Sequence, residues 1–211
     1  MTHVDQIRIA VPRGALFEST LDFLDRLQIA THEVRENDRK LLFEQAGIIT
    51  MRPSDVPTYV EAGAADLGIT GKDVLLEQSE RDLYELVDLG YGECTMVLAT
   101  VDGADPAAEA LRRLGVMRIA TKYPRIATRH FLETGRQAEI VEVKGSVELA
   151  PLTGLAEGIV DLTASGTTLR ENGLVVREEI ARSTARLIGN PVSHKLKAGA
   201  IDALLERLDA V

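Results

Sequence analysis

The chain has 211 residues, of which 45% are hydrophobic and 27% charged, a balance that provides a substantial core and excludes disordered and collagen-like classes. Its 33 acidic residues against 24 basic ones give a net charge of −9, which argues against broad binding to nucleic acid or to an anionic membrane. A single cysteine excludes an internal disulfide, and no apolar run approaches the roughly 18 residues of a membrane span, so we expect a cytoplasmic protein.

Short apolar runs rich in β-branched residues alternate with helical patterns along most of the chain. Such alternation is typical of an α/β protein built on parallel strands with covering helices. The expected strands are residues 7–11, 47–52, 66–70, 83–90, 94–101, 118–121, 138–143 and 159–163. This number of strands exceeds what one small sheet holds.

The expected helices lie between these strands and at the end of the chain. Segment 15–28 carries apolar residues at intervals of three and four, and segment 195–209 carries an apolar stripe, so both are predicted to be amphipathic helices. Another helix is expected from Asp105, with a proline in its first turn, to Gly115. A further one is expected from Pro124 to a point near residue 135.

The domain organisation is inferred from a segment that would lead the chain from a second lobe back to the first. Residues 175–190 are rich in β-branched and charged side chains, which favours an extended segment that carries the chain from one lobe back to the other. We therefore expect a discontinuous first lobe, residues 1–91 plus 180–211, and an inserted second lobe, residues 92–179.

The most informative stretch is residues 159–173, where an apolar strand carrying Asp161 leads into a turn of small and hydroxyl side chains. The turn contains Thr163, Ala164, Ser165, Gly166, Thr167 and Thr168, and a helix is expected to start near Leu169. Exposed backbone N–H groups, hydroxyl donors and a helix N-terminus at one turn fit a phosphate monoester. An ordinary strand-to-helix turn with a threonine cap explains the same residues equally well.

A second turn, residues 143–154, also follows an expected strand. Ser146 is a plausible N-cap, and Glu148 would fall in the first helical turn, where the helix dipole stabilises a carboxylate. Spacing alone favours capping for both residues. The alternative gives Glu148 and Asp161 the task of holding ribose hydroxyls or a Mg²⁺ ion carried by a polyphosphate.

Basic residues gather near the ends of expected strands in the first lobe. Arg13 and Gly14 follow the first strand, and Arg52 ends the strand 47–52. Arg35, Arg39 and Lys40 lie within one short polar stretch, for which a solvated charged face is the commoner explanation. Arginine makes forked contacts with phosphate oxygens, so these cations are candidates for binding a polyphosphate or a departing pyrophosphate.

The remaining reactive side chains do not form a recognisable site. The histidines at 3, 32, 130 and 194 are too scattered in sequence to predict a metal site, and Cys94 lies in an apolar strand pattern that favours a buried position. We assign no resident metal and no catalytic role to any of these five residues.

Four longer strings occur in a characteristic order. They are MRPSDVPTYVEAGAADLGITGKDVL (51–75), ATKYPR (120–125), VKGSVELAPLTGL (143–155) and SGTTLRENGL (165–174). With them, nearly the whole chain resembles the short form of the ATP phosphoribosyltransferases, the first enzymes of histidine biosynthesis. The resemblance implies two α/β lobes of the periplasmic-binding-protein type II kind with the active site in the cleft between them. It also implies a reaction that joins N1 of ATP to the ribose C1 of phosphoribosyl pyrophosphate and releases pyrophosphate, with Mg²⁺ present.

The resemblance further implies roles for individual residues. Ala164, Ser165, Gly166, Thr167 and Thr168 would grip the 5′-phosphate of phosphoribosyl pyrophosphate, with Asp161 and Glu148 near its ribose. Arg39 would be the catalytic cation that stabilises the leaving pyrophosphate, while Arg13, Gly14 and Arg52 would face ATP phosphates or pyrophosphate. The chain departs from the family pattern at Ala15, where a second cation is usual, and at Ala164, where a polar or acidic residue is common.

Partners are also implied by the resemblance. Short forms rely on a separate subunit that resembles histidyl-tRNA synthetase, and the sequence ends at residue 211 with no length left for the regulatory domain of the long form. We therefore expect a hetero-oligomer with a dimer of this chain at its core. Two alternatives stay open: a solute-binding protein, which would need an export signal that the sequence lacks, and a transferase that uses the same sugar donor with a different nucleobase.

Overall fold

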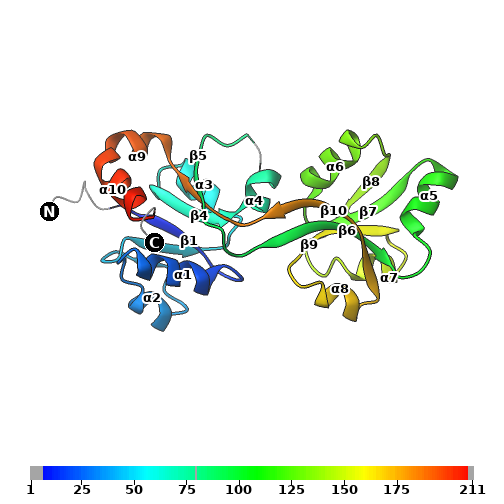
Figure 1. The fold of residues 1–211 in the computed structure, drawn as a ribbon, viewed down its shortest axis with the longest axis horizontal. Helices are drawn as coiled ribbons and strands as arrows, with labels where there is room; N and C mark the ends of the chain where they lie inside the picture. The colour runs from blue at the N-terminus through cyan, green and yellow to red at the C-terminus, as the bar shows by residue number, and fades with distance from the viewer. Residues whose placement is uncertain (1–6, 79, 209–211) are drawn as a thin grey trace. The chain divides into compact units, whose positions relative to one another are not determined.

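The structure is a computed structural model that describes residues 7–78 and 80–208 of the chain (Figure 1). The described chain divides into two compact units. Unit 1 contains residues 7–75, 80–92 and 184–208, and unit 2 contains residues 76–78 and 93–183. Residues 180–183, which the sequence places in the first lobe, belong to unit 2 because strand β10 (Leu174–Ser183) runs through them.

Unit 1 is built on a six-stranded sheet with the order β2-β3-β1-β4-β11-β5. Its strands are β1 (Ile9–Pro12), β2 (Leu42–Phe43), β3 (Ile48–Met51), β4 (Leu67–Gly71), β5 (Tyr84–Asp88) and β11 (Ala185–Gly189). Strand β1 is parallel to β3 and β4, whereas β11 is antiparallel to both of its neighbours. The sheet is therefore mixed, and the expected parallel arrangement holds for its β3-β1-β4 part.

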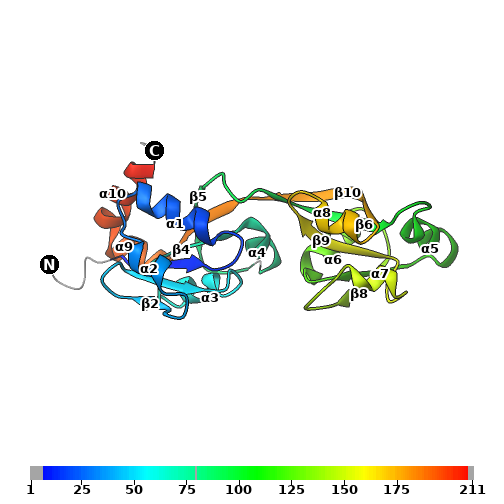
Figure 2. The same ribbon diagram turned by 90° about the horizontal axis from the view of Figure 1, so that it is seen from below.

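Helices cover both faces of this sheet (Figures 1 and 2). They are α1 (Phe17–Arg26), α2 (His32–Glu36), α3 (Val56–Glu61), α4 (Lys72–Glu77), which continues into unit 2, α9 (Pro191–Leu196) and α10 (Ala198–Leu208). Along β1, Ile9 and Val11 pack in a core with α1 and α10, while Ala10 packs with Val56 and Val60 of α3. The alternation of side chains along a strand explains this division into two cores.

Unit 2 is built on a five-stranded sheet with the order β10-β6-β9-β7-β8. Its other strands are β6 (Cys94–Val101), β7 (Met117–Thr121), β8 (Ala138–Glu142) and β9 (Gly158–Thr163). Strands β8, β7 and β9 are parallel, and β6 is antiparallel to both β9 and β10. The segment expected to be merely extended over 175–190 is therefore two paired strands, β10 and β11.

The helices of unit 2 are α5 (Pro106–Leu114), α6 (Pro124–Glu133), α7 (Leu149–Leu152) and α8 (Thr167–Glu171). Residues of α5 and α6 pack with Val160 of β9, and residues in and beside α7 and in α8 pack with Ile159, the residue before it on the same strand. Asp161 alternates to the α7 and α8 face by the same rule. None of the helices described for residues 7–78 and 80–208 is long and apolar enough to cross a membrane.

Candidate active site

The turn between β9 and α8 in unit 2 brings the expected phosphate-binding residues together. Gly166 stands at the helix N-cap with φ +71°, a left-handed conformation that favours glycine. Its N–H donates to Thr163 Oγ1 at 2.9 Å, and the Ser165 and Thr167 hydroxyls are 2.9 Å apart. The residue at the N-cap of α8 is this glycine and not a threonine, so the expected threonine cap is wrong; instead the Ser165 hydroxyl accepts the N–H of Thr167, the first residue of the helix, at 3.4 Å.

A guanidinium group that the sequence reasoning missed lies against this turn. Arg170 Nη1 donates to the main-chain oxygen of Ser165 at 2.9 Å, and its Nη2 donates to Thr167 Oγ1 at 3.0 Å. Ala164, Ser165, Thr167 and Thr168 are exposed. The turn therefore offers hydroxyl groups and a positive charge on an open surface, which suits a phosphate. The sequence feature that could have identified Arg170 is its position four residues after Gly166, about one helical turn away.

Asp161 lies in β9, two residues before the strand ends at Thr163, and is buried. Its Oδ1 accepts the N–H of Leu162 at 2.9 Å, and its Oδ2 lies 3.2 Å from Nζ of Lys122, which follows β7. Burial is the main cause that raises the pKa of Asp161, and the charge of Glu148 raises it further. Lys122 acts in the opposite direction. The structure thus brings Asp161 and Glu148 into electrostatic range and adds Lys122, which the sequence reasoning did not assign.

Glu148 does not have the capping role that its spacing favours. It is the N-cap residue of α7, one position before the helix, and Ser146 lies further back in an exposed position. Main-chain carbonyls close this turn, since Ser146 and Val147 accept the N–H groups of Leu149 and Ala150 at 3.4 and 3.0 Å. Within the described chain no side chain caps α7. The half-buried carboxylate of Glu148 is therefore available to a ligand.

Unit 1 contains a pocket of about 560 Å³ that brings Arg13 and Arg52 together. It lies beside β3 and α3 and has an apolar part formed by leucine, isoleucine and methionine side chains. Its lining consists of Arg8, Arg13, Leu41, Leu42, Ile49, Thr50, Met51, Arg52, Asp55, Tyr59 and Ala64. A pocket with an aromatic ring, apolar side chains and several guanidinium groups suits a nucleotide.

The two expected arginines of this pocket are held differently. Arg13 Nε donates to Thr50 Oγ1 at 3.0 Å, its Nη2 donates to the Lys40 main-chain oxygen at 2.9 Å, and it stacks over Phe17. Arg52 is exposed. Gly14, also exposed, has φ +91°, which lets the chain turn sharply from β1 towards α1. Arg13 is thus fixed in position, and Arg52 is free to reorient towards a ligand.

The polar stretch 35–43 separates into paired and unpaired cations. Arg35 forms ion pairs with Glu18, Asp22 and Asp25 at 2.8, 2.7 and 3.0 Å. Lys40 pairs with Glu33. Arg39 is exposed and has no hydrogen bond or ion pair to any residue of the described chain. Arg39 is therefore the cation of this stretch that is available to an anionic substrate.

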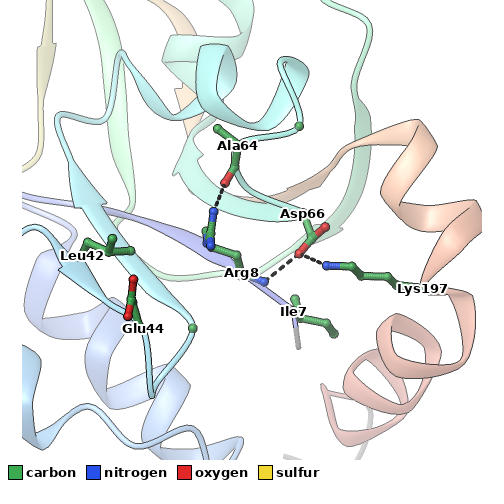
Figure 3. Close-up of a pocket in the computed structure, with 9 residues that line it drawn as sticks. Ile7, Arg8, Leu42, Glu44, Ala64, Asp66 and Lys197 are labelled. Atoms are coloured by element: carbon green, nitrogen blue, oxygen red, sulfur yellow. Dashed lines mark hydrogen bonds and ion pairs between the residues drawn. The ribbon is translucent and has the colours of Figure 1, made fainter. Parts of the chain in front are cut away.

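A second pocket in unit 1, of about 270 Å³, has charged walls that are already paired (Figure 3). Asp66 Oδ2 accepts the main-chain N–H of Arg8 and the ammonium of Lys197, both at 2.8 Å. Burial alone would raise the pKa of Asp66, but these hydrogen bonds outweigh it and hold the pKa below its usual range. Arg8 donates from its side chain to the Ala64 carbonyl at 3.2 Å. We therefore interpret these groups as structural.

Metal-ligating residues do not gather in either unit. Over residues 7–78 and 80–208 no group of three or more histidine, cysteine, aspartate or glutamate side chains is placed to hold a metal ion. Cys94, expected to be buried, is only half-buried at the start of β6.

Comparisons with known proteins agree on one family and one fold. A family model described as ATP phosphoribosyltransferase matches residues 52–210. The ATP phosphoribosyltransferase of Rubrobacter xylanophilus is 55% identical over 202 residues, covering 94% of this chain and 93% of that protein. A solved ATP phosphoribosyl transferase (HisG:HisZ) complex from Thermotoga maritima contains a chain that is 34% identical, with a TM-score of 0.80 and 97% of each chain covered.

A more distant structure shows the fold alone. The VFT2 domain of BvgS from Bordetella pertussis is 17% identical, with a TM-score of 0.57 over 97% of this chain and 90% of that one. The expected fold class, α/β lobes of the periplasmic-binding-protein type II kind, is confirmed by these similarities and by the two mixed sheets.

Proposed function

Because this chain belongs to the ATP phosphoribosyltransferase family, which catalyses the first step of histidine biosynthesis, we propose that unit 2 binds phosphoribosyl pyrophosphate and unit 1 binds ATP. The observation that carries this assignment is the turn after β9. Hydroxyl groups, a left-handed glycine and the Arg170 guanidinium lie in this turn, a few residues after Asp161 in the sequence. The turn can therefore bind a phosphate, and Asp161 can accept a hydrogen bond from a sugar hydroxyl.

The 5′-phosphate of the sugar donor occupies the turn at residues 164–168. The hydroxyls of Ser165, Thr167 and Thr168 donate to its oxygens, and Arg170 balances its charge. Ala164 and Gly166 carry little or no side chain, so the anion can approach the backbone. The ribose hydroxyls donate to the carboxylates of Asp161 and Glu148, neither of which is used in helix capping.

ATP occupies the pocket of about 560 Å³ in unit 1. Its adenine packs against the apolar part of the lining, and its phosphates face Arg13 and Arg52. A Cβ at Gly14 would meet nothing within 4 Å, so the turn after β1 is open, and the positive φ of Gly14, not a lack of space, favours glycine there. Arg39 lies two residues before Leu41 of the lining, so it is placed to meet the departing pyrophosphate.

The mechanism follows from the charges of the two substrates. Adenine N1 has an available lone pair at neutral pH, so attack on the ribose C1 needs no general base. As the new N–C bond forms, the C1–O bond to pyrophosphate breaks and its electron pair leaves with the pyrophosphate oxygen. The protein therefore contributes alignment of two polyanions and stabilisation of the charge that develops on the leaving group, for which Arg39 is the proposed donor.

Mg²⁺ fits the donors of unit 2 as an ion carried by the sugar donor. Glu148 and Asp161 offer carboxylate oxygens within electrostatic range of each other, and hard oxygen donors are the ligands that Mg²⁺ prefers. When bound, the ion would neutralise part of the charge on the pyrophosphate.

The assembly is proposed from the similarity to the Thermotoga maritima complex. That structure joins an ATP phosphoribosyl transferase chain with a second protein, HisZ. We propose that this chain works with such a subunit, related to histidyl-tRNA synthetases, in a hetero-oligomer with a dimer of this chain at its core. The same proposal places it in the cytoplasm, where both substrates are made.

Product analysis tests the assignment of substrates. Purified protein, with and without the partner subunit, is incubated with phosphoribosyl pyrophosphate, Mg²⁺ and either ATP, free adenine or another nucleobase. We expect a phosphoribosyl adduct and stoichiometric pyrophosphate with ATP alone. Adduct formation with a free base would instead support the transferase of different acceptor specificity, and binding without turnover would support a solute-binding role.

A matched pair of variants tests the phosphate turn. Thr168→Val removes an exposed hydroxyl of the turn with little change in shape, and we expect binding of phosphoribosyl pyrophosphate to weaken about tenfold, as for one lost hydrogen bond to a charged group. Thr128→Val makes the same change at an exposed position of α6 and is the control. Equal affinities for the two variants in a calorimetric titration would contradict the placement of the phosphate.

A further inference from the structure

Side-chain hydrogen bonds hold the turn between β9 and α8 at both of its ends. On the strand side the Thr163 hydroxyl accepts the N–H of Gly166 at 2.9 Å. On the helix side the Arg170 side chain folds back over the turn. Its Nη1 donates to the Ser165 main-chain oxygen at 2.9 Å, and its Nη2 donates to Thr167 Oγ1 at 3.0 Å. The guanidinium group therefore connects the two residues that flank Gly166.

Gly166 provides the space for this guanidinium group. A Cβ at Gly166 would lie 3.0 Å from Nη1 of Arg170, which is closer than nearly all Cβ contacts in proteins. The φ of +71° at Gly166 independently favours glycine. A side chain at this position would therefore strain the backbone and also push the guanidinium group away from the Ser165 carbonyl.

The hydroxyl of Thr167 has a proton that the turn itself does not use. A threonine hydroxyl can accept two hydrogen bonds and donate one. Thr167 Oγ1 accepts from Arg170 Nη2 at 3.0 Å and from the Ser165 hydroxyl at 2.9 Å, so both acceptor positions are filled. No residue among 7–78 and 80–208 accepts the Thr167 proton. Because Thr167 is exposed, this proton is available to an acceptor outside the turn, such as a phosphate oxygen.

The two donors to Thr167 differ in how firmly their protons are fixed. The Ser165 hydroxyl can rotate and donate to a bound phosphate instead. The Arg170 guanidinium has protons on all of its nitrogens and can only donate, so its bond to Thr167 persists in either arrangement. Arg170 is exposed and forms no ion pair with a carboxylate of the described chain, so its charge and its other N–H groups remain available to the same anion.

We propose that Arg170 is a positioning residue that holds this turn in its binding conformation before the ligand arrives and directs the Thr167 proton towards the 5′-phosphate of phosphoribosyl pyrophosphate. This inference rests on the proposed phosphate site at residues 164–168. A turn that is already ordered loses less conformational entropy on binding, so Arg170 contributes affinity through its geometry as well as its charge. Because the 5′-phosphate is remote from the reacting ribose C1, the loss of this geometry should raise KM for the sugar donor and change kcat little.

Arg170→Lys separates geometry from charge, because lysine keeps the positive charge but lacks the planar fork that spans two acceptors. At saturating ATP we expect KM for phosphoribosyl pyrophosphate to rise about tenfold, as for one lost hydrogen bond to a charged group, with the same change in Kd from a calorimetric titration. The KM for ATP should not change. Arg113→Lys makes the same exchange on the exposed surface of α5 and is the control. Wild-type KM and Kd in Arg170→Lys would overturn the positioning role.

A double-mutant comparison with Thr167→Val shows whether Arg170 acts through the Thr167 hydroxyl. Valine keeps the shape of threonine but can neither accept from the guanidinium group nor donate to a phosphate. We therefore expect Arg170→Lys to weaken binding much less in the Thr167→Val background than in the wild type. Additive losses would overturn the positioning role. Both side chains are exposed, so all of these variants should melt close to the wild-type temperature.

The same titrations distinguish a failure of this inference from a failure of the phosphate site. If Thr168→Val weakens binding of phosphoribosyl pyrophosphate and Thr167→Val does not, the positioning role is overturned and the phosphate site stands. If neither variant weakens binding, the phosphate does not lie in this turn, and the role of Arg170 is overturned with it.

Discussion

The carboxylate of Glu77 accepts the main-chain N–H of Ile126 at 3.0 Å, although 49 residues separate the two in sequence. Its other oxygen accepts the N–H of Arg125 at the same distance. Both N–H groups belong to the first turn of α6, whose own N-cap residue, Tyr123, makes no side-chain capping bond. The last residue of α4 thus caps a helix of unit 2 and supplies the negative charge that a helix N-terminus favours.

Glu77→Ala should therefore lower the free energy of unfolding of unit 2 by about 1 kcal/mol, with an upper limit of about 2 kcal/mol typical of lost N-caps. Glu77→Gln keeps one acceptor oxygen and should lose less. Urea unfolding followed by circular dichroism measures both. Glu133→Ala, at an exposed position in the last turn of α6, is the control and should change little. Equal stabilities for Glu77→Ala and the control would show that the cap contributes nothing.

Arg39→Ala should slow turnover about 100- to 1,000-fold, the usual loss when one donor to a developing anion is removed. The fold should be unaffected, because Arg39 has no partner among the described residues to lose. Steady-state release of pyrophosphate measures the rate, and thermal melting checks the fold. Arg35→Ala gives the opposite pattern, since Arg35 holds three carboxylates of unit 1 and should affect stability first. Near-normal turnover in Arg39→Ala would refute its catalytic role.

Local sequence signals predicted the elements that depend on local contacts. Strand 94–101 has the expected bounds, and α5 begins and ends as expected: Asp105 accepts the N–H groups of Ala107 and Ala108 at 3.0 and 3.1 Å, and Gly115 has φ +76°. The two-residue strand β2 and the five-residue helix α2 were missed because they hold too few residues to show a period.

Features that depend on strand order could not be predicted in this way. Lys122 and Asp161 meet because β7 and β9 are parallel neighbours with Thr121 beside Val160, a pairing that the sequence does not state. Strand β10 is rich in charged residues and has two irregularities in its pairing with β6, so its alternation of polar and apolar residues is broken. The turn at residues 163–168, the proposed phosphate site, stands out in the sequence because its small and hydroxyl residues are contiguous.

Gly68→Ala should destabilise unit 1 by about 1 to 3 kcal/mol, the usual cost of overpacking a core. A Cβ at Gly68 in β4 would come within 2.6 Å of methyl groups of both Val56 and Val60 in α3. Gly199→Ala in α10 meets nothing within 4 Å and should be neutral or slightly stabilising. Thermal melting compares the two. Val60→Ala removes one of the two methyl groups that the new Cβ would meet. If adding Val60→Ala to Gly68→Ala restores none of the lost stability, the clash is not the cause of the destabilisation.

Asp66→Asn should lower the free energy of unfolding by about 2 kcal/mol at pH 7, since it removes a charged acceptor from the Lys197 ammonium while keeping an oxygen for the Arg8 N–H. Hydrogen bonds hold the pKa of Asp66 below its ordinary value of 3.8, so its contribution is complete above that value. The contribution is lost as the pH falls through the lower pKa of the folded state.

The difference in free energy of unfolding between wild type and Asp66→Asn should therefore become smaller below about pH 4 and stay constant between pH 5 and 7. Urea unfolding over this pH range measures it, and Lys197→Met provides the complementary variant. Because Lys197→Met leaves the buried Asp66 without its cationic partner, it should destabilise the protein most where Asp66 is charged, at neutral pH. If the difference in free energy of unfolding instead grows as the pH falls, the charged form of Asp66 is not what stabilises the protein.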